Sequence, residues 1–183
     1  FYDHGGWWHG YTLYDEMIHV PIVLKLPRNA HAGERNPGMA RHIDLPPTIL
    51  HFARLPKGSR MAGQSLYDDQ EAVHNAAIIH SYAHNDFEGN VVYAVRSAAE
   101  KLITANADNV SHLAPVEFYD MDHDPREKQN LAGEAAYSER EASLRKAMQD
   151  YAEIVKGRAV APANKVPLTG DAAQQLGALG YLQ

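Results

Sequence analysis

Four short segments in the second half of the chain have the composition of β-strands, and they limit the folds that the chain can adopt. These segments cover residues 77–82, 91–96, 101–105 and 116–119, and short polar stretches separate them. Strands joined by short loops pair antiparallel, because a parallel pair needs a crossover connection of about a dozen residues or more. We therefore expect a small antiparallel sheet of four strands, with a turn-rich loop at residues 84–90 between the first two.

A helix is expected to follow this sheet. Ser138 and Glu141 have the spacing of a capping box, in which each side chain satisfies a backbone N–H group at a helix start. Apolar residues then recur at helical spacing, and such a stripe packs against a core. The stripe consists of Leu144, Met148, Tyr151 and Val155. Gly157 is expected to end the helix, and residues 176–182 have the pattern of a further short helix. Residues 76–183 are thus predicted to form a small C-terminal α+β subdomain.

The first part of the chain follows a different pattern. Residues 20–26 form an apolar run rich in β-branched side chains, which suits a strand buried on both faces of a parallel sheet. Asp44 is placed to cap a helix whose first turn contains two prolines. The apolar face of that helix is expected to consist of Ile49, Leu50, Phe52 and Ala53. A strand followed by a helix is typical of α/β proteins, so we expect residues 1–75 to be the C-terminal piece of an α/β core.

Composition excludes several classes of protein. The 183 residues include 17 basic and 23 acidic side chains, and the formal net charge of −6 argues against nucleic acid as a partner. No apolar run approaches the roughly 18 residues that a membrane-spanning helix needs. The chain contains no cysteine, which rules out disulfides, thiolate nucleophiles and zinc–thiolate sites within it.

Side chains suited to chemistry gather at the start of the chain. Three histidines, His4, His9 and His19, stand there with Trp7 and Trp8. Polar and aromatic groups that converge just ahead of a buried strand are typical of the wall of a binding site. The structural alternative is that His19 packs under the strand and that the tryptophans cover the core.

Five motifs, in order along nearly the whole chain, carry a family resemblance. They are DHGGWWHGYTLYDE at residues 3–16, IDLPPTIL at 43–50, GQSL at 63–66, FYDMDHDPREKQNL at 118–131 and LGALGYL at 176–182. Together they resemble the C-terminal half of a sulfatase of the alkaline phosphatase superfamily. The resemblance implies the fold class already described, an α/β/α core piece followed by a small antiparallel four-stranded sheet with a packed helix.

The resemblance also implies roles for residues of the first motif. Asp3 and His4 correspond to a second acidic–histidine pair, and His9 takes the position where relatives carry a Lys or His that faces the sulfate. A cationic donor there would stabilise the charge that develops on the ester oxygens or protonate the leaving group. His4 would line the same pocket or brace the loop, and Trp7 and Trp8 would stack on the leaving group or serve as hydrophobic cover. A second register, in which Asp3 and His4 are themselves metal ligands, stays open.

The function implied by the resemblance is that of a metal-dependent sulfatase that hydrolyses a sulfate monoester. Its cation, Ca²⁺ or alternatively Mg²⁺ or Mn²⁺, would be held mostly by residues upstream of Phe1. The formylglycine nucleophile would also lie upstream, so the isolated chain is expected to be inactive. The substrate would be a sulfate-ester small molecule or a sulfated glycan, with no nucleic acid and no membrane span involved. Relatives of this kind are often periplasmic, secreted or lysosomal, and the sequence does not decide among these compartments.

Two other functions are compatible with the same residues. The superfamily scaffold also serves hydrolases of phosphate or phosphonate esters, which an upstream nucleophile would distinguish from sulfatases. The chain by itself could instead be a non-catalytic structural or binding module, because ester activation needs a nucleophile and a divalent cation that the sequence does not supply.

Overall fold

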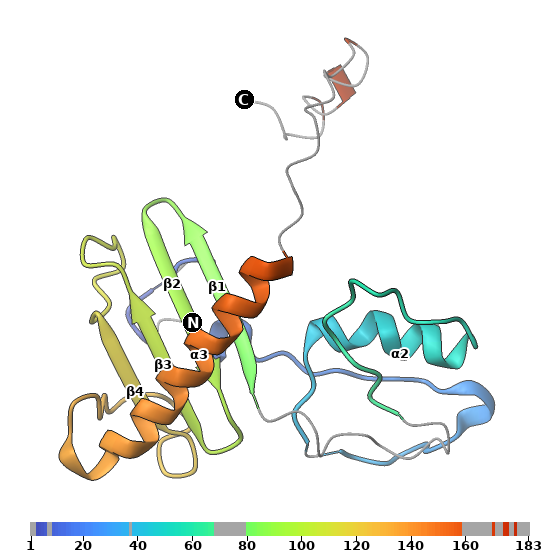
Figure 1. Cartoon of the computed structure of the whole chain (residues 1–183), viewed down its shortest axis with the longest axis horizontal. Coiled ribbons are helices and arrows are strands. Elements are labelled where there is room, and N and C mark those ends of the chain that lie inside the picture. Colours follow the sequence, from blue (N-terminus) through green and yellow to red (C-terminus); the bar gives the residue numbers. More distant parts are fainter. Residues whose placement is uncertain are drawn as a thin grey trace.

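A four-stranded antiparallel sheet forms the centre of the best-packed part of the chain (Figure 1). This computed structural model describes residues 3–6, 9–36, 38–67 and 80–158, together with residues 170, 174, 175 and 178. The strands are β1 (Ser81–Phe87), β2 (Asn90–Arg96), β3 (Glu100–Ala105) and β4 (Val116–Asp120), and they pair in the order β1-β2-β3-β4. The antiparallel sheet predicted from the sequence is confirmed.

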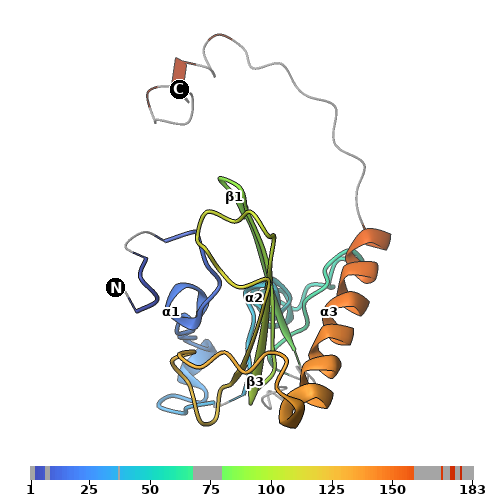
Figure 2. The ribbon, with the colours of Figure 1, turned by 90° about the vertical axis from the view of Figure 1, so that its left-hand side faces the viewer.

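Both faces of the sheet are covered. Figure 2 shows helix α3 (Ser138–Arg158) on one face and the N-terminal segment with the short helix α1 (Asp15–Ile18) on the other. Alternate residues of each strand enter two separate cores. The core under α3 contains Val95, Leu102, Phe118, Leu131 and Leu144. The core under the N-terminal segment contains Leu13, Tyr14, Val92, Ala94, Ile103, Tyr119 and Met121.

The first strand lies later in the chain than its composition predicts. The structure places β1 at Ser81–Phe87, whereas the prediction was 77–82, of which residues 77–79 lie outside the described part. Most of the stretch predicted as a loop is therefore strand, and the turn is only Glu88 and Gly89. Both turn residues have positive φ, 49° and 86°, which is the backbone of a tight hairpin turn. Polar residues occupy β1 because it is an edge strand, where charged side chains are common.

Helix α3 begins at Ser138 as predicted and packs on the sheet through Leu144, which is 1% exposed. The predicted capping box does not form. The three residues before the helix already make a 3-10 turn, so the Ser138 N–H donates to the carbonyl of Ala135 and needs no side-chain acceptor. The Glu141 carboxylate instead accepts from the Gly133 N–H at 3.0 Å. The described helix continues through Gly157 to Arg158, so Gly157 does not stop it.

The strand predicted at residues 20–26 is absent from the structure. The backbone there is extended between α1 and the short 3-10 turn at Pro27–Asn29, and Val23 is 91% exposed. Among the described residues, the sheet contains only β1 to β4, so this segment has no neighbouring strand with which to form hydrogen bonds. An apolar run becomes a strand only where a partner strand is present.

Helix α2 (Leu45–Phe52) confirms the predicted helix but not its buried face. Pro47 and Thr48 are its buried residues, and Ile49 is 66% exposed. The Thr48 hydroxyl donates to the Asp44 carbonyl at 2.6 Å and accepts from the Leu66 N–H at 2.9 Å. These bonds join the IDLPPTIL segment to the GQSL segment, which the sequence had placed in separate motifs.

Asp44 does not cap α2 with its side chain. Its carboxylate receives hydrogen bonds from the Arg41 Nε and Nη2, both at 2.9 Å, and from the Gln64 N–H, also at 2.9 Å. The ion pair with Arg41 is preferred over a helix cap because it satisfies both oxygens of a fully buried carboxylate.

In the part of the chain that the structure covers, no helix is both long and apolar enough to cross a membrane.

Candidate active-site loop

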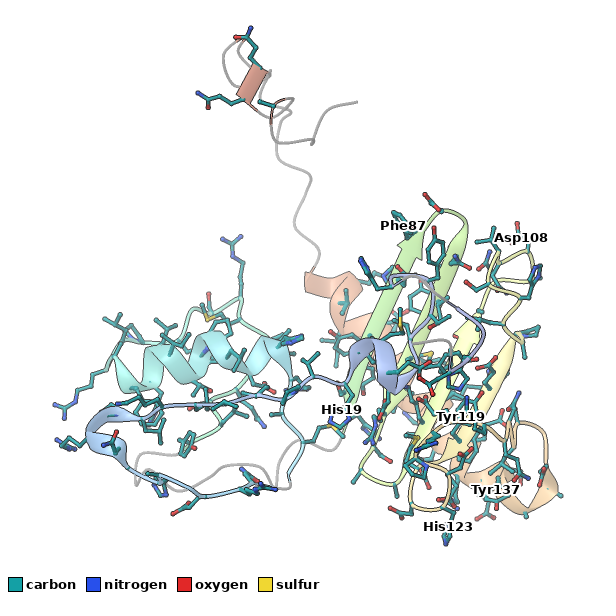
Figure 3. The ribbon with its side chains drawn as sticks, turned by 180° about the vertical axis from the view of Figure 1, so that it is seen from behind. His19, Phe87, Asp108, Tyr119, His123 and Tyr137 are labelled. Atoms are coloured by element: carbon teal, nitrogen blue, oxygen red, sulfur yellow. The ribbon has the colours of Figure 1, made fainter. Side chains whose placement is uncertain are left out.

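The predicted catalytic residue lies on a loop that we call the site loop, residues 3–6 and 9–16. His9 is exposed, and Gly10 follows it with a φ of 91°. Trp7 and Trp8 lie outside the described residues. The site loop runs over the face of the sheet opposite α3 and leads into α1 (Figure 3). His19 lies just after α1, and its side chain is exposed rather than packed beneath a strand.

Both ring nitrogens of His4 are engaged within the protein. Nε2 lies 2.9 Å from the backbone carbonyl oxygen of Glu127, which can only accept, so Nε2 donates. Nδ1 lies 2.5 Å from the Glu16 carboxylate. The ring stacks on Tyr14, with centroids 3.7 Å apart and an interplanar angle of 13°. Of the two roles predicted for His4, this geometry favours bracing the loop.

A buried ion-pair cluster fixes the other end of the site loop to the sheet. Lys101 on β3 is fully buried, and its Nζ lies 2.8 Å from Asp15 Oδ1 and 2.7 Å from Glu127 Oε1. The second oxygen of Glu127 accepts from the Asp15 N–H at 2.6 Å. Arg96 on β2 adds a contact of 3.2 Å from its Nε to Asp15 Oδ2. The Asp15 carboxylate is therefore paired with Lys101 and Arg96, and it anchors the site loop to the sheet.

The pKa values of the two acids in this cluster, Asp15 and Glu127, are shifted in opposite directions. Burial by itself raises the pKa of Asp15, but Lys101 and then Arg96 outweigh it and hold that pKa below its ordinary value. Burial raises the pKa of Glu127 and Lys101 offsets only part of this effect, so the pKa of Glu127 stays above its ordinary value. The difference follows from burial, because the Glu127 side chain is the more enclosed of the two.

A second buried carboxylate holds the same end of the loop, at Tyr14. Glu117 on β4 accepts hydrogen bonds from the hydroxyls of Tyr14, at 2.9 Å, and Tyr119, at 3.0 Å. Its other oxygen accepts from the Ala114 N–H at 3.0 Å. Burial, followed by the charge of Glu117, raises the pKa of both tyrosines, so neither hydroxyl ionises near neutral pH. These groups support the loop.

The β1–β2 hairpin contacts the site loop beside His9. Asn85 Nδ2 donates to the Gly10 carbonyl at 2.7 Å, and the Tyr11 hydroxyl donates to Glu88 at 2.6 Å. Tyr11 also meets Phe87 edge to face, with centroids 5.6 Å apart. Figure 3 places Phe87 at this end of the sheet and His123 at the other. The hairpin therefore borders the position that sequence reasoning assigned to catalysis.

Sequence reasoning missed the residues that hold the loop. Lys101 gave one signal, since a lysine that begins an otherwise apolar strand segment needs a buried partner. Glu127 was visible only as a letter of a family motif. Neither residue could be paired with Asp15 from the sequence, because 86 and 112 positions separate them along the chain.

The described residues do not assemble a metal site of their own. Within those ranges, no group of three or more His, Asp or Glu side chains is arranged to hold a cation. Glu16 is already paired with His4, and Asp15 and Glu127 are already paired with Lys101.

Comparison with known families gives a match over most of the chain. Residues 3–154 match the family described as N-sulphoglucosamine sulphohydrolase, C-terminal. The match spans the site loop, the whole sheet and nearly all of α3. It therefore includes every contact described above.

Individual relatives agree with this match. The chain is 28% identical over 153 residues to an N-acetylglucosamine-6-O-sulfatase of Bacteroides thetaiotaomicron, which covers 79% of this chain and 27% of that protein. It is 27% identical over 150 residues to a multifunctional alkaline phosphatase superfamily protein, PehA, of Trinickia caryophylli, covering 75% and 28%. The chain thus spans little more than a quarter of the length of these relatives.

One solved structure supports the likeness in three dimensions. The structure of BT4656 in complex with its substrate D-glucosamine-2-N,6-O-disulfate matches with a TM-score of 0.53 at 26% identity, covering 62% of this chain and 24% of that one. The four-stranded sheet with its packed helix is the arrangement expected of the C-terminal subdomain of a sulfatase.

Proposed function

This chain belongs to the N-sulphoglucosamine sulphohydrolase C-terminal family, and from that membership we propose that it is the C-terminal part of a sulfatase that hydrolyses a sulfate monoester. The observation that carries the proposal is the family match over residues 3–154, which includes both the loop bearing His9 and the sheet that anchors it. The short share of each relative that the chain covers supports a longer parent protein.

The substrate class that we propose is a sulfated hexosamine, free or within a glycan. Support comes from one relative that is an N-acetylglucosamine-6-O-sulfatase and from a solved neighbour whose substrate is a sulfated glucosamine. A phosphate or phosphonate ester is the second candidate, because another relative is a multifunctional member of the alkaline phosphatase superfamily.

In this proposal His9 is the catalytic residue of the chain. Its exposed imidazole, on a loop fixed to the sheet, would donate to the ester oxygens as negative charge develops there or protonate the leaving group. Trp7 and Trp8 are the proposed stacking side chains for the leaving group. His4 holds the loop through Glu16 and Glu127 while its ring lies beside Tyr14.

The remaining machinery is proposed to come from the rest of the parent. Residues 1–75 would complete an α/β core there, which would cover apolar side chains that are exposed in this chain, among them Val23, Ile49 and Leu55. The divalent cation, proposed to be Ca²⁺ or alternatively Mg²⁺ or Mn²⁺, and a formylglycine nucleophile would be held by that core. The chain by itself would then lack turnover.

The test is a comparison of substrates and variants in the longer protein that carries this chain. Glucosamine 6-sulfate should be hydrolysed faster than an aryl phosphate, and His9→Ala should lower kcat about 10²-fold, the usual scale for a positioned general acid. His123→Ala is the control, since that side chain is 86% exposed and lies at the end of the sheet opposite Phe87. Wild-type kcat in His9→Ala would refute the role of His9, and faster phosphate hydrolysis would favour the second candidate. Turnover by residues 1–183 alone would contradict the assignment of the nucleophile to another part.

A further inference from the structure

The contacts of Glu127 point to a role that goes beyond the family assignment. We propose that Glu127 is a positioning residue that clamps both ends of the site loop and thereby sets the place of His9. The inference rests on the proposed function, because it gives His9 a reason to be held in place. Among the described residues, the contacts of the Glu127 carbonyl and side chain are with His4, Asp15 and Lys101 and not with His9, so its role would be positional and not chemical.

Glu127 makes a separate contact with each end of the site loop. At the beginning of the loop, its backbone carbonyl accepts from His4 Nε2 at 2.9 Å. At the end of the loop, its Oε2 accepts from the Asp15 N–H at 2.6 Å. Lys128, the next residue, adds a hydrogen bond from its Nζ to the Asp3 carbonyl. One short segment thus holds positions 3, 4 and 15, and His9 lies between them.

The clamp is itself rigid. Glu127 is 2% exposed, has a φ of 56°, and donates its own N–H to the Asp124 carbonyl at 3.1 Å. Its Oε1 lies 2.7 Å from Lys101, which also pairs with Asp15 at 2.8 Å. A buried carboxylate in such a network has few alternative positions, because any movement leaves a buried charge without a partner.

A loop fixed at both ends has far fewer conformations than a loop fixed at one. The hairpin limits it further, since Asn85 holds the Gly10 carbonyl directly after His9. Displacement of a catalytic group by about 1 Å can cost about 10²-fold in rate. Releasing the end at Asp15 should therefore reduce turnover without removing any group that contacts the substrate.

The test variant is Glu127→Gln, which keeps an oxygen acceptor of similar shape but loses the charge that pairs with Lys101. Asp44→Asn is the matched control, because Asp44 is also a buried carboxylate paired with a cation, and it accepts its hydrogen bonds from Arg41 and Gln64 rather than from the site loop. Both variants are made in the longer parent protein. Amide hydrogen exchange across residues 9–19 and steady-state kinetics on glucosamine 6-sulfate are measured for each.

Glu127→Gln should speed exchange at the Asp15 amide by about tenfold or more and lower kcat by about 10- to 100-fold with KM nearly unchanged. Asp44→Asn should change neither quantity by more than about twofold. Equal hydrogen exchange of residues 9–19 in Glu127→Gln and wild type would overturn the proposal, as would an equal loss of kcat in Glu127→Gln and Asp44→Asn.

If the wild-type parent hydrolyses no sulfate ester, the proposed function fails, while the exchange measurement still decides whether Glu127 clamps the loop. If Glu127→Gln does not fold, two variants of Lys101 give the same comparison. Lys101→Arg keeps the positive charge and Lys101→Met removes it. Only Lys101→Met should speed hydrogen exchange at the Asp15 amide.

Discussion

Among the described residues four carboxylates are buried, and three of them, Asp44, Glu117 and Glu127, are each compensated by a different set of donors. Asp44 receives two hydrogen bonds from a guanidinium and two from backbone amides. Glu117 receives two from tyrosine hydroxyls and one from an amide. Glu127 faces a buried ammonium group and accepts from one amide. Burial of a charge is tolerated only with such partners, so each of these acids fixes a particular contact between distant segments.

Gly63 shows how closely the motif segments approach each other at the scale of one residue. A Cβ at this position would lie 1.7 Å from the Ile43 carbonyl oxygen, a backbone atom that cannot move aside alone. Gly63→Ala should therefore lower the free energy of unfolding by at least about 2 kcal/mol, as overpacking does. Urea denaturation of the chain checks this. Gly58→Ala is the control, because its Cβ would meet only the flexible Met61 side chain at 3.7 Å, and a comparable loss there would contradict the explanation.

At the scale of an element, α3 shows that only part of a periodic stripe is buried. Leu144 enters the core between the helix and the sheet, and Tyr151 stacks on Tyr82 of the edge strand with centroids 3.9 Å apart. Val155, one turn further, is 47% exposed. The stripe continues beyond the surface that the sheet offers, because a sheet of four strands is narrower than a helix of 21 residues is long.

The two ends of this stripe should respond differently to truncation. Leu144→Ala leaves a cavity in a closed core and should cost about 2–5 kcal/mol of unfolding free energy. Val155→Ala removes a side chain that is half in solvent and should change the same quantity by no more than about 0.5 kcal/mol. Thermal melts followed by circular dichroism give both values. Similar costs for the two would mean that residues beyond the sheet also bury the end of the helix.

At the scale of the whole molecule, the free energy of unfolding depends on pH through buried acids whose pKa values are shifted in opposite directions. Arg41 and the Gln64 amide outweigh burial and lower the pKa of Asp44, and Asp15 is shifted in the same direction by Lys101. Glu127 is shifted upward by burial. A lowered pKa adds stability above the unfolded value, and a raised pKa adds stability below it.

The contribution of Asp44 should therefore disappear in acid. At pH values between its folded pKa and the unfolded value of about 3.9, the unfolded chain binds more protons, so stability falls as the pH falls. Wild type should be more stable than Asp44→Asn by roughly 1–3 kcal/mol at pH 6, and the difference should shrink below pH about 4. Urea titrations between these pH values measure it. A difference that stays constant down to pH about 2.5 would show that the Asp44 carboxylate does not contribute through its charge.

Local patterns were enough to predict the sheet, its antiparallel pairing, α2 and α3. Strand composition, proline at a helix start and the helical spacing of apolar residues act over a few residues, so they can be recognised without a partner. The same patterns failed where the outcome depended on a neighbour. The run at residues 20–26 forms no strand because no strand lies beside it among the described residues. The Asp44 side chain pairs with Arg41 and does not cap α2.

The four strands of the sheet, α2, α3 and, through five ordered motifs, the sulfatase family could therefore be predicted from the sequence alone. The side chains that hold the site loop could be identified only once the chain was folded. Lys101, Glu117 and Glu127 lie far from residues 3–16 along the chain, and their roles arise when folding removes water from charges that must then find partners. Because each buried charge finds its partner in another segment of the chain, the pairing produces no periodic pattern in the sequence of either segment.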